Sequence, residues 1–205
     1  MKPFVAAGLA LLLAAPGLAV PPRSLSDFTA PELVKHLQLQ PLAEEGGFFR
    51  QIYLSSLAVE DAALRPTGPG QKHPLGTVIY FLMTPDAFSA LHRLATDETL
   101  IHVAGDPVET LILFPDGTSR ELVIGPDLAR GQLLNFTVPA GCWQGHSIMI
   151  GGPHGYALFN AIMTPGFTWS DFEVGNLDSL LQTYPTAPAP RIRSLVRPEP
   201  ALGLR

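Results

Sequence analysis

The sequence predicts an all-β domain, a barrel or a sandwich, with short helices only near its two ends. Roughly nine or ten short segments, alternating or wholly apolar, are separated by turn signals about every 8–12 residues, a pattern typical of such folds. The chain of 205 residues contains 21 Pro and 19 Gly, which punctuate apolar runs rather than forming tracts. This distribution favours many strands joined by turns over a disordered chain. The length favours one domain with a core large enough to be stable alone.

The elements are expected in a simple order from the N-terminus. Residues 20–28 form a lead-in, after which Thr29 caps a helix that runs to about Leu39, with Pro31 in its first turn. A glycine pair opens a strand from about residue 48. Residues 76–83 predict a strand that is apolar on both faces.

The later strands alternate with turns until the C-terminal part of the chain. Strands are expected over about residues 88–94, 98–102, 109–114, 119–124, 132–138, 146–150 and 156–163. A helix is expected to begin near Ser170, because Leu177, Leu180 and Leu181 have helical spacing. The proline-rich tail over residues 185–205 is expected to be an arm or a disordered end.

Composition excludes several kinds of partner and site. The formal net charge is −5, and the 13 Lys and Arg residues are scattered without a basic stripe, which argues against nucleic-acid binding. The single cysteine, Cys142, excludes an internal disulfide and a cysteine-rich zinc site.

Residues 1–19 have the layout of a secretory signal peptide. Lys2 supplies a positive start, residues 4–13 are apolar, and small residues precede a cleavage point after Ala19. The alternative is an uncleaved membrane anchor, but the run is short for a span, which needs about 20 apolar residues. We expect a secreted protein without membrane contact after cleavage. Asn135 begins a glycosylation sequon that applies if the cell is eukaryotic.

The stretch over residues 90–107 places acidic and basic residues on two predicted strands. In a strand, side chains alternate faces with period two, so Glu98, Leu100 and His102 share one face, while His92 lies on a face of the preceding strand. If both faces point inward, an acid and a base meet in an apolar interior, which shifts pKa values and supports proton transfer. The alternative is a set of satisfied polar residues in a barrel wall.

Short motifs follow one another in a specific order between about Leu37 and Tyr184. They are Glu-Gly-Gly-Phe-Phe-Arg at 45–50, Gly-Thr-Val-Ile-Tyr-Phe-Leu at 76–82, Phe-Ser-Ala-Leu-His-Arg-Leu at 88–94, Asp-Glu at 97–98, Ala-Gly-Asp-Pro at 104–107, Pro-Asp-Gly at 115–117, Gly-Gln at 131–132, Val-Pro-Ala-Gly-Cys-Trp at 138–143, and Pro-Gly-Phe with Asp-Phe-Glu within 165–173. Their order and spacing resemble the cupin superfamily, specifically its DUF985 or cupin type 5 branch. The resemblance implies a double-stranded β-helix, the small jelly-roll barrel, over residues 29–184, usually as a homodimer.

The same resemblance bears on metal binding, because metal-binding cupins present three histidines and one glutamate from two motifs. The corresponding positions here are Ala90, His92, Glu98 and Gln144, so two of the four ligands remain. A divalent transition metal normally needs three or more protein ligands. We therefore expect no metal cofactor. The alternative is a bound divalent transition metal. Other histidines that lie on the same strand faces would then replace the missing ligands, which gives the ligand set His92, Glu98, His102 and His146.

The leading functional hypothesis is a metal-independent isomerase, epimerase, cyclase or lyase. Its substrate would be a small, partly apolar organic molecule, sugar-like or a specialised-metabolite intermediate. His92 would be the base and Glu98 its orienting partner, while Tyr80 would return the proton across the barrel. Cupin-fold sugar epimerases use a comparable pairing of histidine base and tyrosine acid. The alternatives are a non-catalytic binding or storage module and a metal-dependent dioxygenase.

The remaining predicted site residues would bind the substrate. Arg50 and Gln144 would contact a carbonyl or carboxylate oxygen. The other predicted substrate-binding residues are Phe49, Leu82, Leu100, His102 and Trp143, whose apolar members would form walls that exclude water. Four predicted site residues have a structural alternative: Arg50 as a surface ion pair, Tyr80 and Trp143 as packing, and His92 as a core histidine bonded to backbone. The other histidines, His36, His73 and His154, are expected at the surface or in loops.

Overall fold

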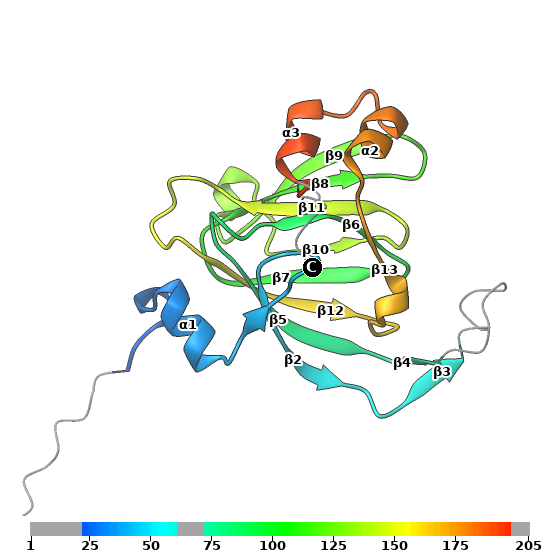
Figure 1. The fold of residues 1–205 in the computed structure, drawn as a ribbon. Helices are drawn as coiled ribbons and strands as arrows, with labels where there is room; N and C mark the ends of the chain where they lie inside the picture. The colour runs from blue at the N-terminus through cyan, green and yellow to red at the C-terminus, as the bar shows by residue number, and fades with distance from the viewer. Residues whose placement is uncertain (1–21, 61–71, 198–205) are drawn as a thin grey trace, which may run out of the picture.

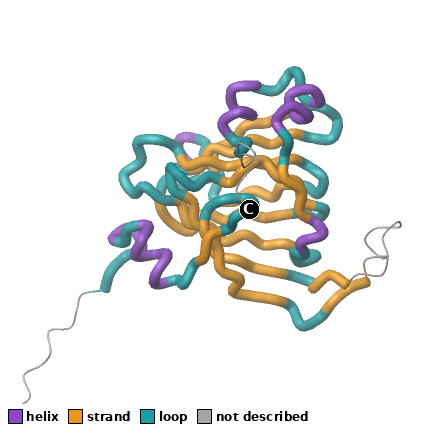
Figure 2. The backbone as a smooth tube through the Cα atoms, in the orientation of Figure 1, coloured by secondary structure: helices purple, strands orange, loops and turns teal. Residues whose placement is uncertain are grey.

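The computed structural model describes residues 22–60 and 72–197, and in them two antiparallel β-sheets pack face to face as a jelly-roll barrel (Figure 1). The predicted signal peptide, residues 1–19, lies outside the described residues. No helix within the described ranges has both the length and the apolar character needed to cross a membrane. The all-β fold with short helices near both ends is confirmed, and the helices lie at the periphery of the strands (Figure 2).

The first sheet has six strands in the order β1-β2-β5-β12-β7-β10. Their bounds are β1 Gln40–Pro41, β2 Phe48–Leu54, β5 Thr77–Met83, β12 Ala157–Met163, β7 Glu98–Gly105 and β10 Asn135–Val138. Every neighbouring pair is antiparallel. A short two-stranded extension, β3 Ala58–Glu60 with β4 Lys72–Pro74, projects beside it.

The second sheet has five strands in the order β13-β6-β11-β8-β9. Their bounds are β13 Phe172–Val174, β6 Ser89–Leu94, β11 Trp143–Ile148, β8 Val108–Leu113 and β9 Ser119–Ile124. The helices are α1 Ala30–His36, α2 Leu177–Thr183 and α3 Ala189–Ser194, with 3₁₀ turns η1 Leu25–Asp27, η3 Leu128–Arg130 and η4 Trp169–Asp171. The helix predicted to begin near Ser170 therefore begins later, after β13.

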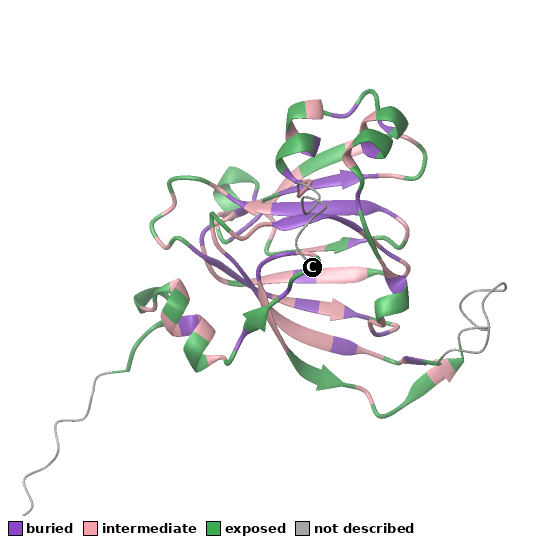
Figure 3. Cartoon of the chain, viewed as in Figure 1, coloured by how far each residue is buried: buried purple, intermediate pink, exposed green. Residues whose placement is uncertain are grey.

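Strand alternation divides the apolar residues into a central core and two outer layers. On β5, Phe81 and Met83 face the core between the sheets, whereas Leu82 packs outward against α1. This strand is apolar on both faces because both faces are covered. Figure 3 shows the same layering, with strands largely buried and the helices exposed on their outer sides.

Local sequence explains where the first helix begins. The Glu32 carboxylate accepts a hydrogen bond from the Thr29 backbone N–H at 2.8 Å, as in a capping box, and Pro31 occupies the first turn. Leu33 then packs in the outer cluster on the first sheet with Tyr156. The helix begins where the sequence predicts, and it covers the outer face opposite the barrel interior.

The expectation of an arm or a disordered end is wrong for residues 185–197. They include α3, whose Ile192 is fully buried together with Leu195. The Leu91 backbone N–H donates to the Leu195 carbonyl at 2.7 Å, which ties this segment to the second sheet. Proline is favourable in the first turn of a helix, so Pro190 marks a helix start rather than a linker. Residues 198–205 lie outside the described ranges.

Candidate functional site

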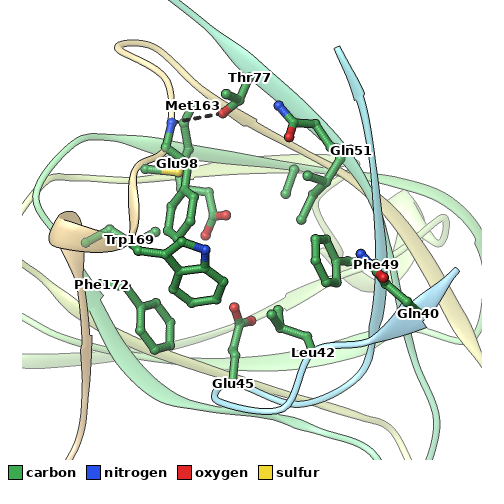
Figure 4. A pocket seen from close by; sticks show the side chains of 14 residues that line it. Gln40, Leu42, Glu45, Phe49, Gln51, Thr77, Glu98, Met163, Trp169 and Phe172 are labelled. Atoms are coloured by element: carbon green, nitrogen blue, oxygen red, sulfur yellow. Dashed lines mark hydrogen bonds between the residues drawn. The ribbon is translucent and has the colours of Figure 1, made fainter. Parts of the chain in front are cut away.

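A cavity of about 320 Å³ opens between the sheets at one end of the barrel (Figure 4). Its walls come from the β1–β2 region, from β5, β7 and β12, from the end of β6, and from the segment that joins β12 to β13. Residues that line it are Gln40, Leu42, Glu45, Phe49, Gln51, Thr77, Ile79, Leu94, Glu98, Ala161, Met163, Phe167, Trp169 and Phe172. The lining is mainly apolar, with two carboxylates as its charged groups. An enclosed apolar pocket with a few polar groups is typical of a small-molecule site.

Glu98, the first residue of β7, supplies one of these carboxylates. Its Oε2 accepts a hydrogen bond from Gln144 Nε2 at 2.7 Å. Burial raises the pKa of Glu98 from its ordinary value of 4.5 to about 7, and the negative charge of Glu45 adds to the rise, while His92 and the bond from Gln144 oppose it. A carboxyl group with this pKa is present in both protonation states near neutral pH, as proton transfer requires.

Glu45 supplies the second carboxylate from the turn between β1 and β2. Its Oε1 accepts a hydrogen bond from Ser89 Oγ at 2.6 Å, and its carbonyl accepts one from the Ala90 N–H at 2.9 Å. The turn lies so close to β6 that a Cβ on Gly46 would stand 2.1 Å from the Phe88 carbonyl oxygen. Gly46 also has a φ of 113°, which favours glycine. The glycine therefore permits the approach that places Glu45 in the pocket.

His92 lies inside the barrel but behind the pocket wall. Its Nδ1–H donates to the Ala90 carbonyl at 2.8 Å, so Nε2 carries the lone pair when the ring is neutral. The ring stacks on Phe172, with 5.4 Å between ring centroids, and Nδ1 is 4.0 Å from Glu45 Oε1. The expected pairing in which Glu98 orients His92 is wrong: the backbone orients His92, and Gln144 bonds Glu98.

A chain of neutral groups continues from Glu98 into the barrel. Because Gln144 donates through Nε2 to Glu98, its Oε1 accepts from His146 Nε2–H at 3.3 Å. His146 Nδ1 then accepts from Thr110 Oγ1 at 2.9 Å. Burial lowers the pKa of His146 to about 3, with His92 and Arg191 adding to the shift. His146 is therefore neutral at physiological pH and holds Gln144 in the orientation that bonds Glu98.

The other predicted site residues that face the barrel interior lie at different distances from the pocket. Phe49 lines the pocket as predicted. Leu100 shares the inward face of β7 with Glu98 but belongs to the central core rather than to the pocket lining. His102 lies farther along β7, where its ring contacts Phe159 edge-on and its Nε2 donates to the Asp106 carbonyl at 3.3 Å. Burial lowers the pKa of His102.

Three predicted site residues face away from the pocket, on the outer side of the first sheet. Tyr80 and Leu82 pack in the cluster under α1, and Arg50 Nη1 donates to Gln38 Oε1 at 3.0 Å. The Arg50 guanidinium lies 6.0 Å from the centre of the Tyr80 ring. The predictions that Tyr80 returns a proton across the barrel and that Arg50 binds a substrate oxygen are therefore wrong. The pocket takes the alternate side chains of β5, Thr77 and Ile79.

Trp143 was also expected in the pocket wall, and that prediction is wrong. It lies on the outer face of the second sheet, in a cluster with Leu180 and Leu195, and the Arg93 guanidinium is 4.9 Å from the centre of its ring. Gln144, the next residue, faces inward, where its side chain bonds Glu98 and is not part of the pocket lining; its contact with a substrate oxygen stays a prediction. The packing role stated as the alternative for Trp143 is the observed one.

Sequence reasoning missed the aromatic mouth of the pocket, formed by Phe167, Trp169 and Phe172 in the segment after β12. Pairing of β13 with β6 brings Phe172 opposite Leu94. His73 helps to hold this segment and is fully buried, so its expected place at the surface is wrong. Its Nε2 lies 2.9 Å from Asp171 Oδ2. The contacts span about a hundred residues of sequence, so no local signal predicted them.

The donor set does not fit the metal centre that metal-binding cupins present. Ala90 has no side-chain donor, Gln144 uses its amide nitrogen on Glu98, and both His146 nitrogens have partners within the barrel. His102 bonds at another part of β7. Within residues 22–60 and 72–197, no three His, Cys, Asp or Glu side chains converge as metal ligands. The alternative ligand set His92, Glu98, His102 and His146 is therefore not assembled.

Comparisons with known proteins agree with this fold. A hypothetical protein from Leishmania major, a solved structure, is 33% identical with a TM-score of 0.74, and the match covers 83% of this chain and 100% of that one. A protein from Shewanella oneidensis is 32% identical with a TM-score of 0.72, covering 84% and 99%. An uncharacterized protein of Saccharomyces cerevisiae is 25% identical in an alignment 160 residues long, and the match covers 74% of this chain and 75% of the yeast protein. The family described as Cupin superfamily (DUF985) matches residues 31–175, and the chain belongs to it.

Proposed function

We propose that the protein is a metal-independent isomerase or lyase that moves a proton on a small organic substrate, with Glu98 as the group that exchanges it. The observation that carries this proposal is a carboxyl group with a pKa of about 7 facing a mainly apolar cavity. An acid–base catalyst works best when its pKa lies near the working pH. The buried setting that raises this pKa also limits water around the reacting atoms.

The proposed step begins with the Glu98 carboxylate. It takes a proton from a substrate carbon next to a carbonyl group, and the electron pair of the broken C–H bond moves into the substrate as an enolate. In a substrate with a conjugated double bond, protonated Glu98 then returns the proton to the far carbon of the dienolate, which shifts the double bond and gives an isomer. In a substrate with a leaving group on the next carbon, the enolate instead expels that group with its bonding electron pair, which gives an elimination product. Gln144 holds Oε2 of Glu98, so Oε1 is the oxygen available to the substrate.

His92 has a different part in this proposal from the one the sequence predicts. The pocket lining does not include it, and Phe172 stacks against its ring. We assign His92 an electrostatic effect on the two carboxylates: its Nδ1 lies 4.0 Å from Glu45 Oε1, and it lowers the pKa of Glu98. The substrate would contact the carboxylates and the apolar walls.

The test follows deuterium uptake from heavy water into carbon positions of small molecules extracted from the source organism. Native protein should introduce deuterium into at least one compound, read by mass spectrometry, and Glu98→Gln should abolish the uptake. Glu121→Gln is the matched control, since Glu121 is exposed on β9 away from the pocket. Equal uptake with native protein and Glu98→Gln, or no uptake with either, contradicts the proposal.

A second candidate is a non-catalytic module that holds a small ligand in the same barrel. The observation that favours it is the outward orientation of Tyr80, which removes the predicted proton-returning partner from the pocket. This candidate predicts a ligand that co-purifies with the protein and no deuterium uptake. The deuterium experiment therefore separates the two.

A further inference from the structure

We propose that the pocket takes an organic cation, a small molecule that carries a protonated or quaternary amine. This inference rests on the proposed function only in placing the ligand in the same cavity, and it names the class of ligand. Two independent features of the pocket lining support it: the sign of its charges and the arrangement of its aromatic rings.

The charges in the pocket are of one sign. Glu45 and Glu98 line it, and among the described residues that do so there is no Lys, Arg or His. The hydrogen bonds that the two carboxylates receive come from neutral groups, the Ser89 hydroxyl and the Gln144 amide. The basic group closest to them, His92, lies behind the wall at 4.0 Å from Glu45. An anionic ligand would meet repulsion here, whereas an ammonium group would be attracted to both carboxylates.

Aromatic rings lie on two sides of the same space. Trp169 meets Phe167 edge to face, with 5.1 Å between ring centroids and 80° between ring planes, and meets Phe172 at 5.8 Å and 79°. Figure 4 shows Trp169 and Phe172 on one side and Phe49 on the other, with the carboxylates of Glu45 and Glu98 pointing into the space between them. Rings at steep angles to one another present faces and edges to different sides of the cavity.

Aromatic faces and carboxylates together are the groups that recognise quaternary and protonated amines. The negative face of each ring attracts a cation and also packs against the apolar substituents of that cation, whereas a carboxylate alone contributes only the attraction of charge. A cavity of about 320 Å³ suits a ligand of small-metabolite size. Glu45 would pair with the ammonium group, and Glu98 would remain the group that exchanges a proton.

The two carboxylates also make binding depend on pH. Glu98 and Glu45 repel each other, and this repulsion contributes to the raised pKa of Glu98, which His92 partly opposes. A bound cation offsets the repulsion, so it binds more tightly when Glu98 is ionised. Affinity for a permanent cation should therefore rise with pH between about pH 6 and pH 8, across the titration of Glu98.

The test compares three probes of similar shape and different charge by isothermal titration calorimetry with the purified protein. Choline is the cation, 3,3-dimethylbutan-1-ol is the neutral analogue, and 3,3-dimethylbutanoate is the anion. Choline should bind at least about tenfold more tightly than the neutral analogue, as expected for desolvated cation–π and charge contacts. The anion should bind most weakly. Equal binding of all three, tighter binding of the anion, or no binding of any probe overturns the inference.

Two variants assign the effect to the pocket. Trp169→Leu keeps an apolar wall without the ring, so it should weaken choline binding by about threefold to thirtyfold while leaving the neutral analogue nearly unchanged. Glu45→Gln should weaken choline binding selectively in the same way, and Glu121→Gln should not. If Trp169→Leu weakens both probes equally, the ring acts only as a wall and the inference fails.

The outcomes separate this inference from the proposed function. If the probes show the charge preference but no deuterium uptake occurs, the protein binds ammonium compounds and the proposed enzymatic activity is wrong. Glu98-dependent uptake without charge preference retains proton transfer and removes the amine as the class of ligand.

Discussion

Ionising the Glu98 carboxyl group costs more free energy than ionising a glutamate in water. The group is buried away from solvent, it accepts a hydrogen bond from the neutral Gln144 amide, and the negative charge of Glu45 lies near it. The same surroundings make it useful, since both its protonated and ionised forms exist near neutral pH. The neighbouring Gln144–His146–Thr110 chain is fully hydrogen-bonded, so it supports Glu98 without an unsatisfied polar group of its own.

Replacing Glu98 with glutamine should stabilise the protein at alkaline pH. The pKa of Glu98 is raised from 4.5 to about 7, so the stability it contributes is complete below pH 4.5 and is lost as the pH rises through 7. Glu98→Gln cannot ionise, and we expect its free energy of unfolding to exceed that of the native protein by about 2–4 kcal/mol more at pH 8 than at pH 4. Urea denaturation at both pH values measures this difference, and a gap that does not change with pH contradicts it.

His146 should have the opposite dependence on pH. Its pKa is lowered from 6.5 to about 3, so its stabilising contribution is present above pH 6.5 and is lost as the pH falls toward 3. His146→Gln does not titrate, and its stability should therefore decline less than that of the native protein between about pH 6.5 and pH 4. Thermal unfolding across this range provides the measurement. Parallel pH profiles would show that His146 is not held neutral.

Side-chain alternation predicted some of these positions and failed at others for a physical reason. Glu98, Leu100 and His102 face inward together, because alternate residues of a strand share a face. Gln144 faces inward on β11, at a position that a family motif indicates. On β5 every residue after Thr77 is aliphatic, aromatic or Met, and both faces of the strand are covered. The alternation of side chains therefore does not show which face Tyr80 takes. The residues that were missed, such as Trp169, reach the pocket only through long-range pairing.

Among the elements, the segment between β12 and β13, together with the first residue of β13, carries the aromatic mouth of the pocket. The buried contact between His73 and Asp171 connects it to β4, and the pairing of β13 with β6 fixes its other end. At the C-terminal end, α3 covers the second sheet. Its proline-rich sequence resembles a linker locally, and only the partners of Ile192 and Leu195 show that it is part of the core.

Truncating a buried side chain of α3 should be costly. Ile192→Ala should lower the free energy of unfolding by about 2–4 kcal/mol, since Ile192 is fully buried in the outer cluster of the second sheet. Leu128→Ala is the control, because Leu128 is 62% exposed on η3 and should change stability by less than about 0.5 kcal/mol. Denaturant unfolding of both variants gives the comparison. Similar effects of the two substitutions would mean that α3 does not pack in solution.

At the scale of the whole molecule, the covered outer faces contrast with an exposed apolar patch in the described part of the chain. This patch consists of Ile52, Tyr53 and Leu54 at the end of β2, together with Leu57. Exposed apolar patches often mark interfaces, and the family resemblance implies a homodimer. We therefore expect a homodimer with this patch at its interface. The predicted secretion and signal peptide concern residues outside the described ranges and stay predictions.

The dimer can be tested with two matched charge insertions. Leu54 and Leu128 are 61% and 62% exposed, so Leu54→Glu and Leu128→Glu place the same charge at equally exposed positions. Leu54→Glu should yield a monomer in light scattering, because it buries a charge at the proposed interface, whereas Leu128→Glu should remain a dimer. A native protein that is monomeric, or two variants that behave alike, would rule out this interface.

The central claim is that the barrel holds one carboxyl group poised to exchange a proton near neutral pH. The most direct measurement is a pH titration of the ¹³C resonance of the Glu98 carboxyl carbon, assigned by its absence in Glu98→Gln. We predict a midpoint of about 7, and a lower midpoint in Glu45→Gln, where the neighbouring negative charge is removed. A midpoint near 4.5, the ordinary value for glutamate, would contradict the account.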